Sequence, residues 1–274
     1  MQEIKLSVVI PAYKDPYHEK TVRDLLDNSE LGDKLEIVSV FDSYWPTWEI
    51  VEDPRRRIVH VGKNRGMRGA INAGVDVSRG EFFCRLDEHC CFSKGWDKEL
   101  TDTCQPNQIM TARRYFLDPE KWEVMEENGH IDYERLTIQD MGNGVRKFSG
   151  QKWKSRAKER AEIMIDETQA MQGSMWIMPR KWFDEVCGGE LQSEGYGPAY
   201  QDSVEICMKT WRAGGKLMVN KNAWFAHKHR GFSRTHQEGT KENPWIREKS
   251  WTYALEQWED YYNKVLLPKW SKEF

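Results

Sequence analysis

The stretch NRGMRGAINAGVDVSRGEFFCRLDEH, residues 64–89, decides the fold of this 274-residue chain. Residues 67–78 carry small side chains on one face at helical spacing and predict a helix. Residues 80–86 are a mainly apolar run, which is typical of a buried strand. Two carboxylates and a histidine follow at once, Asp87, Glu88 and His89. The stretch therefore predicts a helix that leads into a buried strand with polar groups at its carboxyl end.

The same alternation of strand and helix extends through the first half of the chain. Strands are predicted over residues 4–13, 35–43 and 57–62, and a helix over residues 18–30. The alternation implies βαβ units with right-handed crossovers and a mostly parallel central sheet flanked by helices, an α/β fold. Ligands of such sheets bind beyond the carboxyl ends of the strands. Three polar features should therefore converge on one edge of the sheet: Pro11-Ala12-Tyr13, Asp42 and the group that starts at Asp87.

The second half of the chain has a less regular pattern. Residues 113–168 are charged and predict loops, with a helical piece at 153–167. A strand is predicted over residues 170–179, a helix over 197–215 and a pair of strands over 216–229. The tail from Pro244 has helical spacing, with one apolar face formed by Trp251, Leu255, Trp258, Tyr262 and Val265. No repeat or linker interrupts the pattern, so we expect a single domain over residues 1–274.

The composition and the charge argue against several classes of protein. Lys and Arg number 41 against 44 Asp and Glu, and a net charge of −3 does not indicate a globally basic nucleic-acid binder. The six cysteines have no C-x-x-C spacing and predict reduced, structural thiols. The first residues do not resemble a signal peptide, and no apolar window approaches the roughly 20 residues of a membrane span. We therefore expect a cytoplasmic protein, and the oligomeric state stays open.

Asp87 and His89 are the strongest candidate metal ligands. Residues i and i+2 at the end of a strand leave it on the same side, so both side chains can face one point while Glu88 points away. A carboxylate and an imidazole aimed together form half of a divalent-cation site, and the mixed oxygen and nitrogen set suits Mn²⁺ better than Mg²⁺. The alternative is a turn that simply ends a strand.

Three motifs in this order resemble nucleotide-sugar glycosyltransferases with the GT-A (Rossmann-like) fold, of family 2 and of the polypeptide N-acetylgalactosaminyltransferases. They are SVVIPAYKD, the stretch quoted above, and EGYGPAYQDSVEICMKTWRAGG. The helix motif of these families matches Asn64, Gly66, Ala70, Asn72 and Gly74. Their D-x-D or D-x-H motif matches Asp87 and His89, and LDEHC is similar to the LDAHC of the N-acetylgalactosaminyl enzymes. The resemblance covers roughly residues 5–104 and 170–230.

The resemblance implies roles for the matching positions in the donor site. Pro11, Ala12 and Tyr13 would line the nucleobase and ribose pocket, and Asp42 would accept a hydrogen bond from the base. Arg65 and Arg68 would lie near the diphosphate. Asp87 would contact the ribose and the metal, His89 and His227 would bind the metal, and Gly173, Ser174 and Trp176 would form the floor for sugar and acceptor. The alternatives are a turn aspartate at 42, surface arginines at 65 and 68, a core tryptophan at 176, and His229 in place of His227.

The resemblance also implies a catalytic pair at the start of the helix predicted over residues 197–215. Asp202 and Glu205 are neighbours on one helix face. Family 2 places its general base at an acidic pair here, whereas this chain has Gln201 before Asp202, so Asp202 remains as the candidate base. Ordinary negative charge at a helix start is the alternative. The pattern lies between that of inverting family 2 and that of the retaining N-acetylgalactosaminyl enzymes, and we favour inversion.

The implied function is a metal-dependent glycosyltransferase of the hexosyltransferase type. It would use Mn²⁺ or Mg²⁺ and transfer a sugar, which the family likeness implies to be UDP-linked, to an acceptor hydroxyl. Residues 1–104 would be the nucleotide-binding half, 105–243 the acceptor-binding half and 244–274 an aromatic helical tail. Alternatives are a retaining transferase, a sugar-nucleotidyltransferase and a non-catalytic nucleotide or carbohydrate binder. The basic run at 146–160 allows a polyanionic acceptor, including modified-base DNA, and a glycan, lipid or protein acceptor is equally open.

Overall fold

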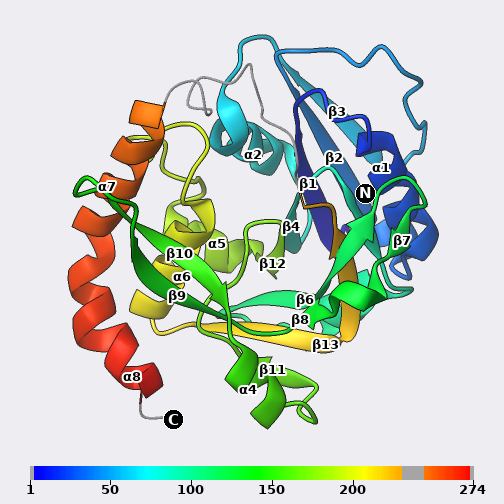
Figure 1. Ribbon diagram of the computed structural model, residues 1–274. Coiled ribbons are helices and arrows are strands. Elements are labelled where there is room, and N and C mark those ends of the chain that lie inside the picture. Colours follow the sequence, from blue (N-terminus) through cyan, green and yellow to red (C-terminus); the bar gives the residue numbers. More distant parts are fainter. Residues whose placement is uncertain (1–2, 230–243, 272–274) are drawn as a thin grey trace.

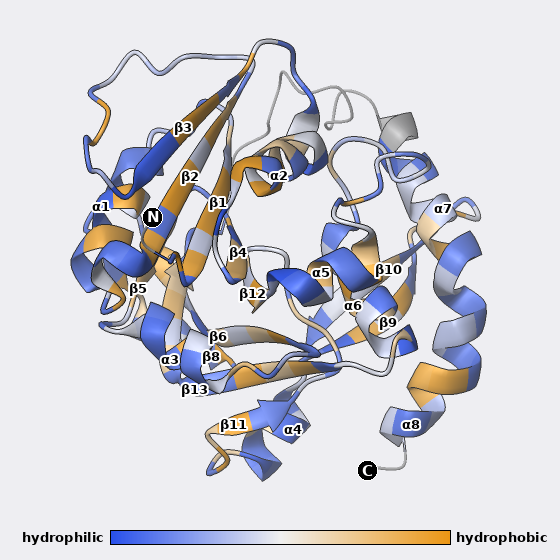
Figure 2. Cartoon of the chain, turned by 180° about the vertical axis from the view of Figure 1, so that it is seen from behind, coloured by the Kyte–Doolittle hydropathy of each residue, from blue (hydrophilic) through white to orange (hydrophobic). Residues whose placement is uncertain are grey.

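The computed structural model describes residues 3–229 and 244–271, and its centre is a parallel sheet (Figure 1). Strands β1 (Leu6–Ala12), β2 (Leu35–Asp42), β3 (Arg56–Val61) and β4 (Phe82–Leu86) pair in parallel, in the order β4-β1-β2-β3. Every residue of β1, β2 and β4 is buried, because a parallel sheet is covered on both faces. The apolar colour of these strands is visible from behind in Figure 2. The predicted strands and the helices α1 (His18–Asn28) and α2 (Gly66–Val77) are confirmed to within a few residues.

The sheet continues past β4 into strands of mixed direction. Its order is β11-β13-β6-β12-β4-β1-β2-β3, with β12 (Met175–Pro179) antiparallel to β4 and β13 (Lys216–His227) parallel to β6 (Gln108–Asp118). The short strand β5 (Cys90–Phe92) pairs with the end of β13. Three further helices belong to this body, α3 (Trp96–Thr103), α5 (Arg180–Cys187) and α6 (Asp202–Arg212). The carboxyl ends of β4 and β13 therefore meet near one place, although 138 residues separate His89 from His227.

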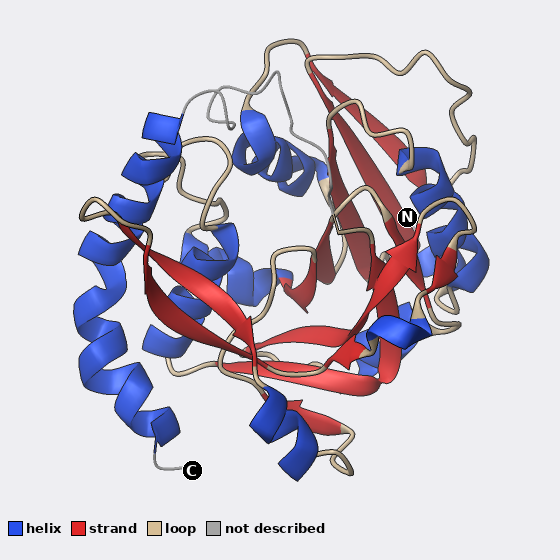
Figure 3. Ribbon diagram, in the orientation of Figure 1, coloured by secondary structure: helices blue, strands red, loops and turns tan. Residues whose placement is uncertain are grey.

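The prediction of a loop-like segment over residues 113–168 was wrong. Apart from the helix α4 (Lys154–Glu159), the segment is largely β structure (Figure 3): the end of β6, then β7 (Glu123–Val124), β8 (His130–Ile131), the hairpin β9 (Glu134–Asp140) with β10 (Arg146–Lys152), and β11 (Ile165–Glu167). The hairpin buries only Leu136 and Phe148, and its other side chains are partly or fully exposed. A strand that buries one residue on one face has too few apolar positions to show a period of two.

The predicted strand pair over residues 216–229 is one strand. β13 runs for 12 residues, and its register against β6 shifts between Asn220 and Trp224. The polar sequence Asn220-Lys221-Asn222 resembles a turn, but it forms an irregularity within a continuous strand. The side chain of Asn220 stabilises the bulge, because its amide donates to Glu99 (2.9 Å) and its oxygen accepts the N–H of Asn222 (2.9 Å).

The C-terminal tail is helical, as predicted, but its face shifts near the end. The helix α7 (Pro244–Tyr261) lies against β10, and a π-helical turn (Tyr262–Leu266) connects it to α8 (Leu267–Ser271). Because a π turn adds one residue to the helical repeat, the buried position moves from Val265, which is 49% exposed, to Leu266, which is 1% exposed. The prediction that Val265 lies on the buried face was therefore wrong.

Two properties of the chain follow from the described residues as a whole. All six cysteines are free, and all but Cys187 are buried. None of the helices within residues 3–229 and 244–271 combines the length and the apolar character that crossing a bilayer requires.

Candidate active site

Three predicted metal ligands come together at the carboxyl ends of β4 and β13. Asp87 and His89 follow β4, and His227 is the last residue of β13. One ligand atom from each lies within 4.8 Å of the others. His227 Nε2 is 3.1 Å from Asp87 Oδ2 and 3.1 Å from His89 Nε2. One carboxylate and two imidazoles that converge in this way fit a divalent transition metal.

Asp15 orients His89, and this residue was missed in the sequence. Its Oδ2 lies 3.0 Å from His89 Nδ1, and its Oδ1 accepts the N–H of Tyr17 (2.9 Å). A carboxylate on Nδ1 fixes the proton there and leaves the Nε2 lone pair directed at Asp87 and His227, which is the usual support of a metal-binding histidine. The sequence held a weak signal, because Asp15 follows β1 at the same edge of the sheet.

The protonation states of the group suit a cation at neutral pH. Burial lowers the pKa of His227 to about 3 in spite of the nearby Asp87 carboxylate, so the imidazole is neutral. Burial opposes ionisation of Asp87, but Arg85 and then His227 outweigh it and hold the pKa of Asp87 below its usual range. His229 is exposed and does not belong to the group, although its ring lies 5.2 Å from that of His227. The structure therefore brings His227, rather than His229, to the Asp87–His89 pair.

Arg85 links this group to Asp202 and was also missed in the sequence. The side chain leaves β4 on the same face as Asp87 and is 2% exposed. Its Nη1 lies 2.9 Å from Asp87 Oδ1, and its Nε lies 3.7 Å from Asp202 Oδ2. Buried charges need partners, so a single arginine in an otherwise apolar strand was the signal for this bridge.

Asp202 is the first residue of α6 and lies 7% exposed at the floor of the site. The preceding residue, Gln201, has a left-handed backbone (φ 59°), which turns the chain into the helix. Gly173 makes room for the carboxylate, because a Cβ at this position would lie 3.0 Å from Asp202 Oδ2. Asp87, Arg85, Asp202 and Gly173 thus form one continuous floor.

A small pocket opens beside Asp87, on the side of β1 and α2. Most of the predicted base and ribose residues line it, namely Pro11, Ala12, Tyr13 and Asp42. Asp42 also has a structural role, because its carboxylate accepts the backbone N–H groups of Arg65 and Gly66 (both 2.8 Å) at the start of α2. Burial raises the pKa of Asp42 despite these hydrogen bonds. Glu88 points away from the metal group, as expected, and accepts the N–H of Tyr13 (3.0 Å).

The family described as "Glycosyl transferase family 2" matches residues 7–187. The chain belongs to glycosyl transferase family 2.

Sequence similarity to known glycosyltransferases agrees with this family assignment. The chain is 25% identical over 197 residues to "Putative inactive polypeptide N-acetylgalactosaminyltransferase 12" of Drosophila melanogaster, with 72% of this chain and 32% of that protein covered. It is 25% identical over 227 residues to "Polypeptide N-acetylgalactosaminyltransferase 10" of Homo sapiens, with 77% and 35% covered. The chain thus spans about a third of the length of these relatives.

The fold agrees as well. The structure of GalNAc-T7 with UDP, GalNAc and Mn²⁺ matches with a TM-score of 0.69 at 17% identity, over 96% of this chain and 50% of that one. This likeness, together with the mixed sheet, confirms the predicted GT-A fold.

Two predicted site residues of this family 2 chain, one for donor binding and one for catalysis, are instead bound to each other. Arg68 and Glu205 are fully buried and form an ion pair. Arg68 also donates to the carbonyls of Tyr200 (2.8 Å) and Gln192 (2.8 Å), and Lys209 donates to Glu205 (2.6 Å). Because these contacts occupy both side chains, the structure differs from the prediction that Arg68 meets a diphosphate and that Glu205 is catalytic. They join α2 to α6 instead.

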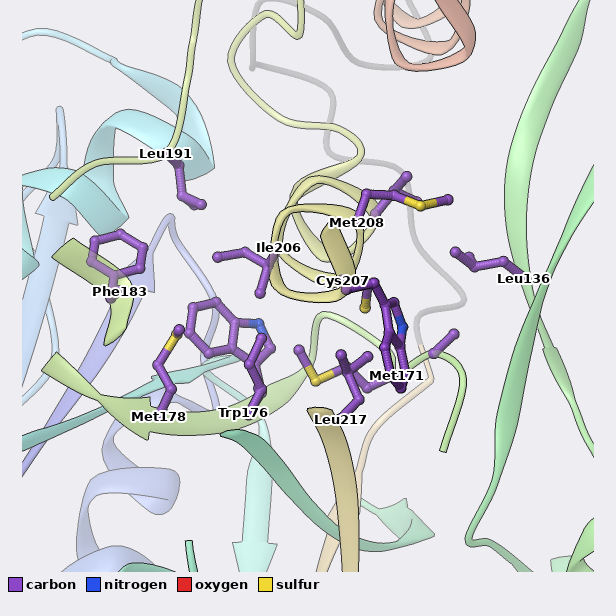
Figure 4. Packing of buried hydrophobic residues seen from close by; sticks show 14 of the residues in the cluster. Leu136, Met171, Trp176, Met178, Phe183, Leu191, Ile206, Cys207, Met208 and Leu217 are labelled. Atoms are coloured by element: carbon purple, nitrogen blue, oxygen red, sulfur yellow. The ribbon is translucent and has the colours of Figure 1, made fainter. Parts of the chain in front are cut away.

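Three further predicted positions differ in how they reach the site. Trp176 is fully buried in the core (Figure 4). Its ring centroid lies 5.2 Å from that of Phe83, so the structure shows the alternative of a core residue. The Arg65 residue is exposed, and only its backbone N–H meets Asp42. Ser174 supports the site through its carbonyl, which accepts the N–H of Asp87 (2.8 Å). The sequence also predicts that Arg230, Arg234 and His236 lie in a loop that could close over the diphosphate, and these residues lie outside the described part of the chain.

Proposed function

We propose that this chain is a metal-dependent glycosyltransferase that transfers a sugar from a UDP-sugar to an acceptor hydroxyl. The observation that carries the proposal is the Asp87–His89–His227 group at the rim of the pocket lined by Pro11, Ala12 and Tyr13. A nucleoside diphosphate in this pocket would reach the metal group with its phosphates. The match to GalNAc-T7 with UDP and Mn²⁺ supports this donor and this metal, with Mg²⁺ as the alternative.

The metal would be held by Asp87, His89 and His227, with Asp15 fixing the orientation of His89. When bound, the cation neutralises the charge of the nucleoside diphosphate as it leaves. Two of the three side chains are in the protonation state that a ligand needs, because Asp87 is ionised and His227 is neutral. The donor set therefore fits the proposed group.

We propose inversion, with Asp202 as the general base. The bond between the anomeric carbon and the diphosphate oxygen breaks, the acceptor oxygen bonds to that carbon from the opposite face, and the acceptor proton passes to Asp202. Arg85 keeps the carboxylate aimed at the floor of the site. Retention remains the alternative, because it requires no base and Asp202 already has a cationic neighbour.

The division of the chain into two halves and its cellular location stay proposals as well. All eight lining residues of the pocket come from residues 1–104, which supports a nucleotide-binding half there, and an acceptor-binding half over residues 105–243 stays a prediction. A cytoplasmic location is the expectation from the sequence.

Thermal-shift measurements with UDP and UDP-sugars, with and without Mn²⁺, test the donor. UDP with Mn²⁺ should raise the melting temperature of the wild type, and His89→Ala and His227→Ala should weaken that binding. His60→Ala is the matched control, because it removes an exposed imidazole on β3, outside the group. No stabilisation of the wild type by any nucleotide with metal would refute the donor class.

The role of Asp202 needs a separate measurement. Asp202→Asn should abolish UDP-sugar hydrolysis while it leaves the affinity for UDP and Mn²⁺ unchanged. A variant that hydrolyses the donor at the wild-type rate would remove Asp202 as the base. A wild-type protein that binds the donor but never turns it over would favour a non-catalytic binder.

A further inference from the structure

A cationic and aromatic cluster lies beside the metal group, on the side of β6 and β10. It consists of Arg114 and Phe116 of β6, Lys152 of β10 and His229, which follows β13. Phe116 pairs with the metal-group residue His227 in the β6–β13 ladder. The ring of Phe116 lies 4.5 Å from that of His229, and Lys152 Nζ lies 4.5 Å from the centre of the Phe116 ring. The cluster thus adjoins His227 directly.

Positive charge exceeds negative charge in this cluster. Arg114 is 5% exposed, and it pairs with Glu134 (3.0 Å) and Gln172. Its Nε is nevertheless buried with no hydrogen-bond partner in the part of the chain that the structure describes. Lys152 faces Glu134 across the β9–β10 hairpin but has no ion pair within the described residues. The single carboxylate of Glu134 therefore lies beside two cations, Arg114 and Lys152.

The electrostatic neighbours of Lys152 agree with this imbalance. Burial lowers the pKa of Lys152, and the positive charges of Arg114 and Lys154 lower it further, while Glu134 only partly compensates. An anion placed between Lys152 and Arg114 would relieve this repulsion and would lie beside the Arg114 guanidinium. The geometry and the charge both indicate that this position accepts an anionic group.

The position of the cluster indicates which substrate brings that anion. The donor pocket is lined by residues of β1, β2 and α2, such as Pro11, Asp42 and Gly66. The cluster comes from β6, β10 and the end of β13, and the metal group lies between the two. A donor diphosphate is therefore expected at the metal group, and the cluster faces the side from which an acceptor would approach.

We propose that Lys152 and Arg114 form a subsite for a phosphate or carboxylate group of the acceptor, close to the hydroxyl that receives the sugar. This inference rests on the proposed function and narrows its acceptor to an anionic one. Two other cations of the basic run are already paired, because Arg146 pairs with Glu259 and the buried Arg156 pairs with Asp166. The subsite formed by Lys152 and Arg114 has room for one anionic group.

Small alcohols that differ only in charge test the subsite. Glycerol, glycerol 3-phosphate and glycerate are titrated into the wild-type complex with Mn²⁺ and UDP, and the melting temperature is followed. Glycerol 3-phosphate, glycerate or both should stabilise the complex saturably, and the comparison between them identifies phosphate or carboxylate as the source of the anion. Glycerol should have no effect. Equal binding of glycerol, or no saturable binding of either anion, would overturn the proposal.

Variants then assign the binding to the cluster. Lys152→Ala should weaken the anion roughly tenfold, as expected for one charge-assisted contact of about 1.4 kcal/mol, and Lys152→Arg should restore it. Lys158→Ala is the matched control, because this exposed lysine on α4 lies outside the cluster. Unchanged anion affinity in Lys152→Ala would overturn the proposal. So would a loss of UDP–Mn²⁺ affinity in that variant, since the lysine would then serve the donor. Failure of UDP and Mn²⁺ to bind the wild type would instead refute the proposed function.

Discussion

Replacing Arg85 by methionine removes a buried cation from between two carboxylates. Methionine keeps much of the volume of the side chain but leaves Asp87 and Asp202 without the guanidinium that lies 2.9 and 3.7 Å from them. Removing one partner of a buried ion pair destabilises a protein by about 3–5 kcal/mol, because an uncompensated charge stays behind. A domain is typically stable by about 5–15 kcal/mol, so the loss in Arg85→Met should be a large part of the free energy of unfolding.

The loss should depend on pH in a defined direction. Against the opposing effect of burial, Arg85 is the largest favourable influence that holds the pKa of Asp87 below its usual range. A depressed carboxyl pKa contributes stability above the unfolded value of about 3.9, and that contribution disappears as the pH falls through the folded value. The difference between wild type and Arg85→Met should therefore be full at pH 7 and shrink as the pH falls below about 4.

Urea denaturation in the presence of a chelator, at pH 7 and below about pH 4, measures the difference in the free energy of unfolding between wild type and Arg85→Met. Arg146→Met is the control, because it removes a guanidinium from an exposed pair with Glu259 and should leave the free energy of unfolding nearly unchanged. In the double variant Arg85→Met/Asp202→Asn, part of the stability should return, because one of the two unpaired charges is gone. An Arg85→Met variant within 1 kcal/mol of wild type at pH 7, or one whose loss is unchanged in acid, would refute the reasoning.

Three other outcomes are expected. Asp15→Asn should weaken Mn²⁺ binding about 10–100-fold in calorimetry, because His89 loses the carboxylate that orients it, and unchanged affinity would exclude this support. Leu266→Ala should lower the free energy of unfolding by about 2–5 kcal/mol and Val265→Ala by less than about 0.5, and the reverse order would contradict the π turn. Burial and then Arg56 lower the pKa of His18 to about 4, so between about pH 6.5 and 4 the unfolded chain takes up a proton that the native state does not. The free energy of unfolding should therefore fall by up to about 3 kcal/mol as the pH is lowered through this range, and His18→Gln should flatten this pH dependence.

The donor half of the fold was predictable because its physical signals are local. Strands buried on both faces are continuous apolar runs, and their ends are marked by polar residues such as Asp42 and Asp87. The metal group followed from this topology, since His227 ends a strand at the same edge. The hairpin over residues 134–152 left no such signal, because it buries one residue in each strand.

The missed site residues depend on contacts that no local pattern reveals. Asp15 meets His89 across 74 residues, and Arg85 meets Asp202 across the sheet face. Arg68 and Glu205 showed the converse, because one matched a donor-binding position and the other a catalytic position, while each charge was satisfied by the other, 137 residues away. Residue type and position predicted where charges lie, but only the three-dimensional pairing decides which of them remain for a ligand.

The large sequence separation between the metal ligands also affects the order in which parts of the chain can fold. His227 lies 140 residues from Asp87, and it arrives only when β13 has docked along β6 and received β5 on its other side. Contacts of such long sequence separation form late, because the loops between them must close first. Mn²⁺ affinity should thus appear in the last phase of refolding, after the parallel strands are in place. A stopped-flow experiment that follows metal uptake during refolding would then report when the whole sheet is complete. The bound ion would thus serve as a probe of the last folding step as well as a catalytic cofactor.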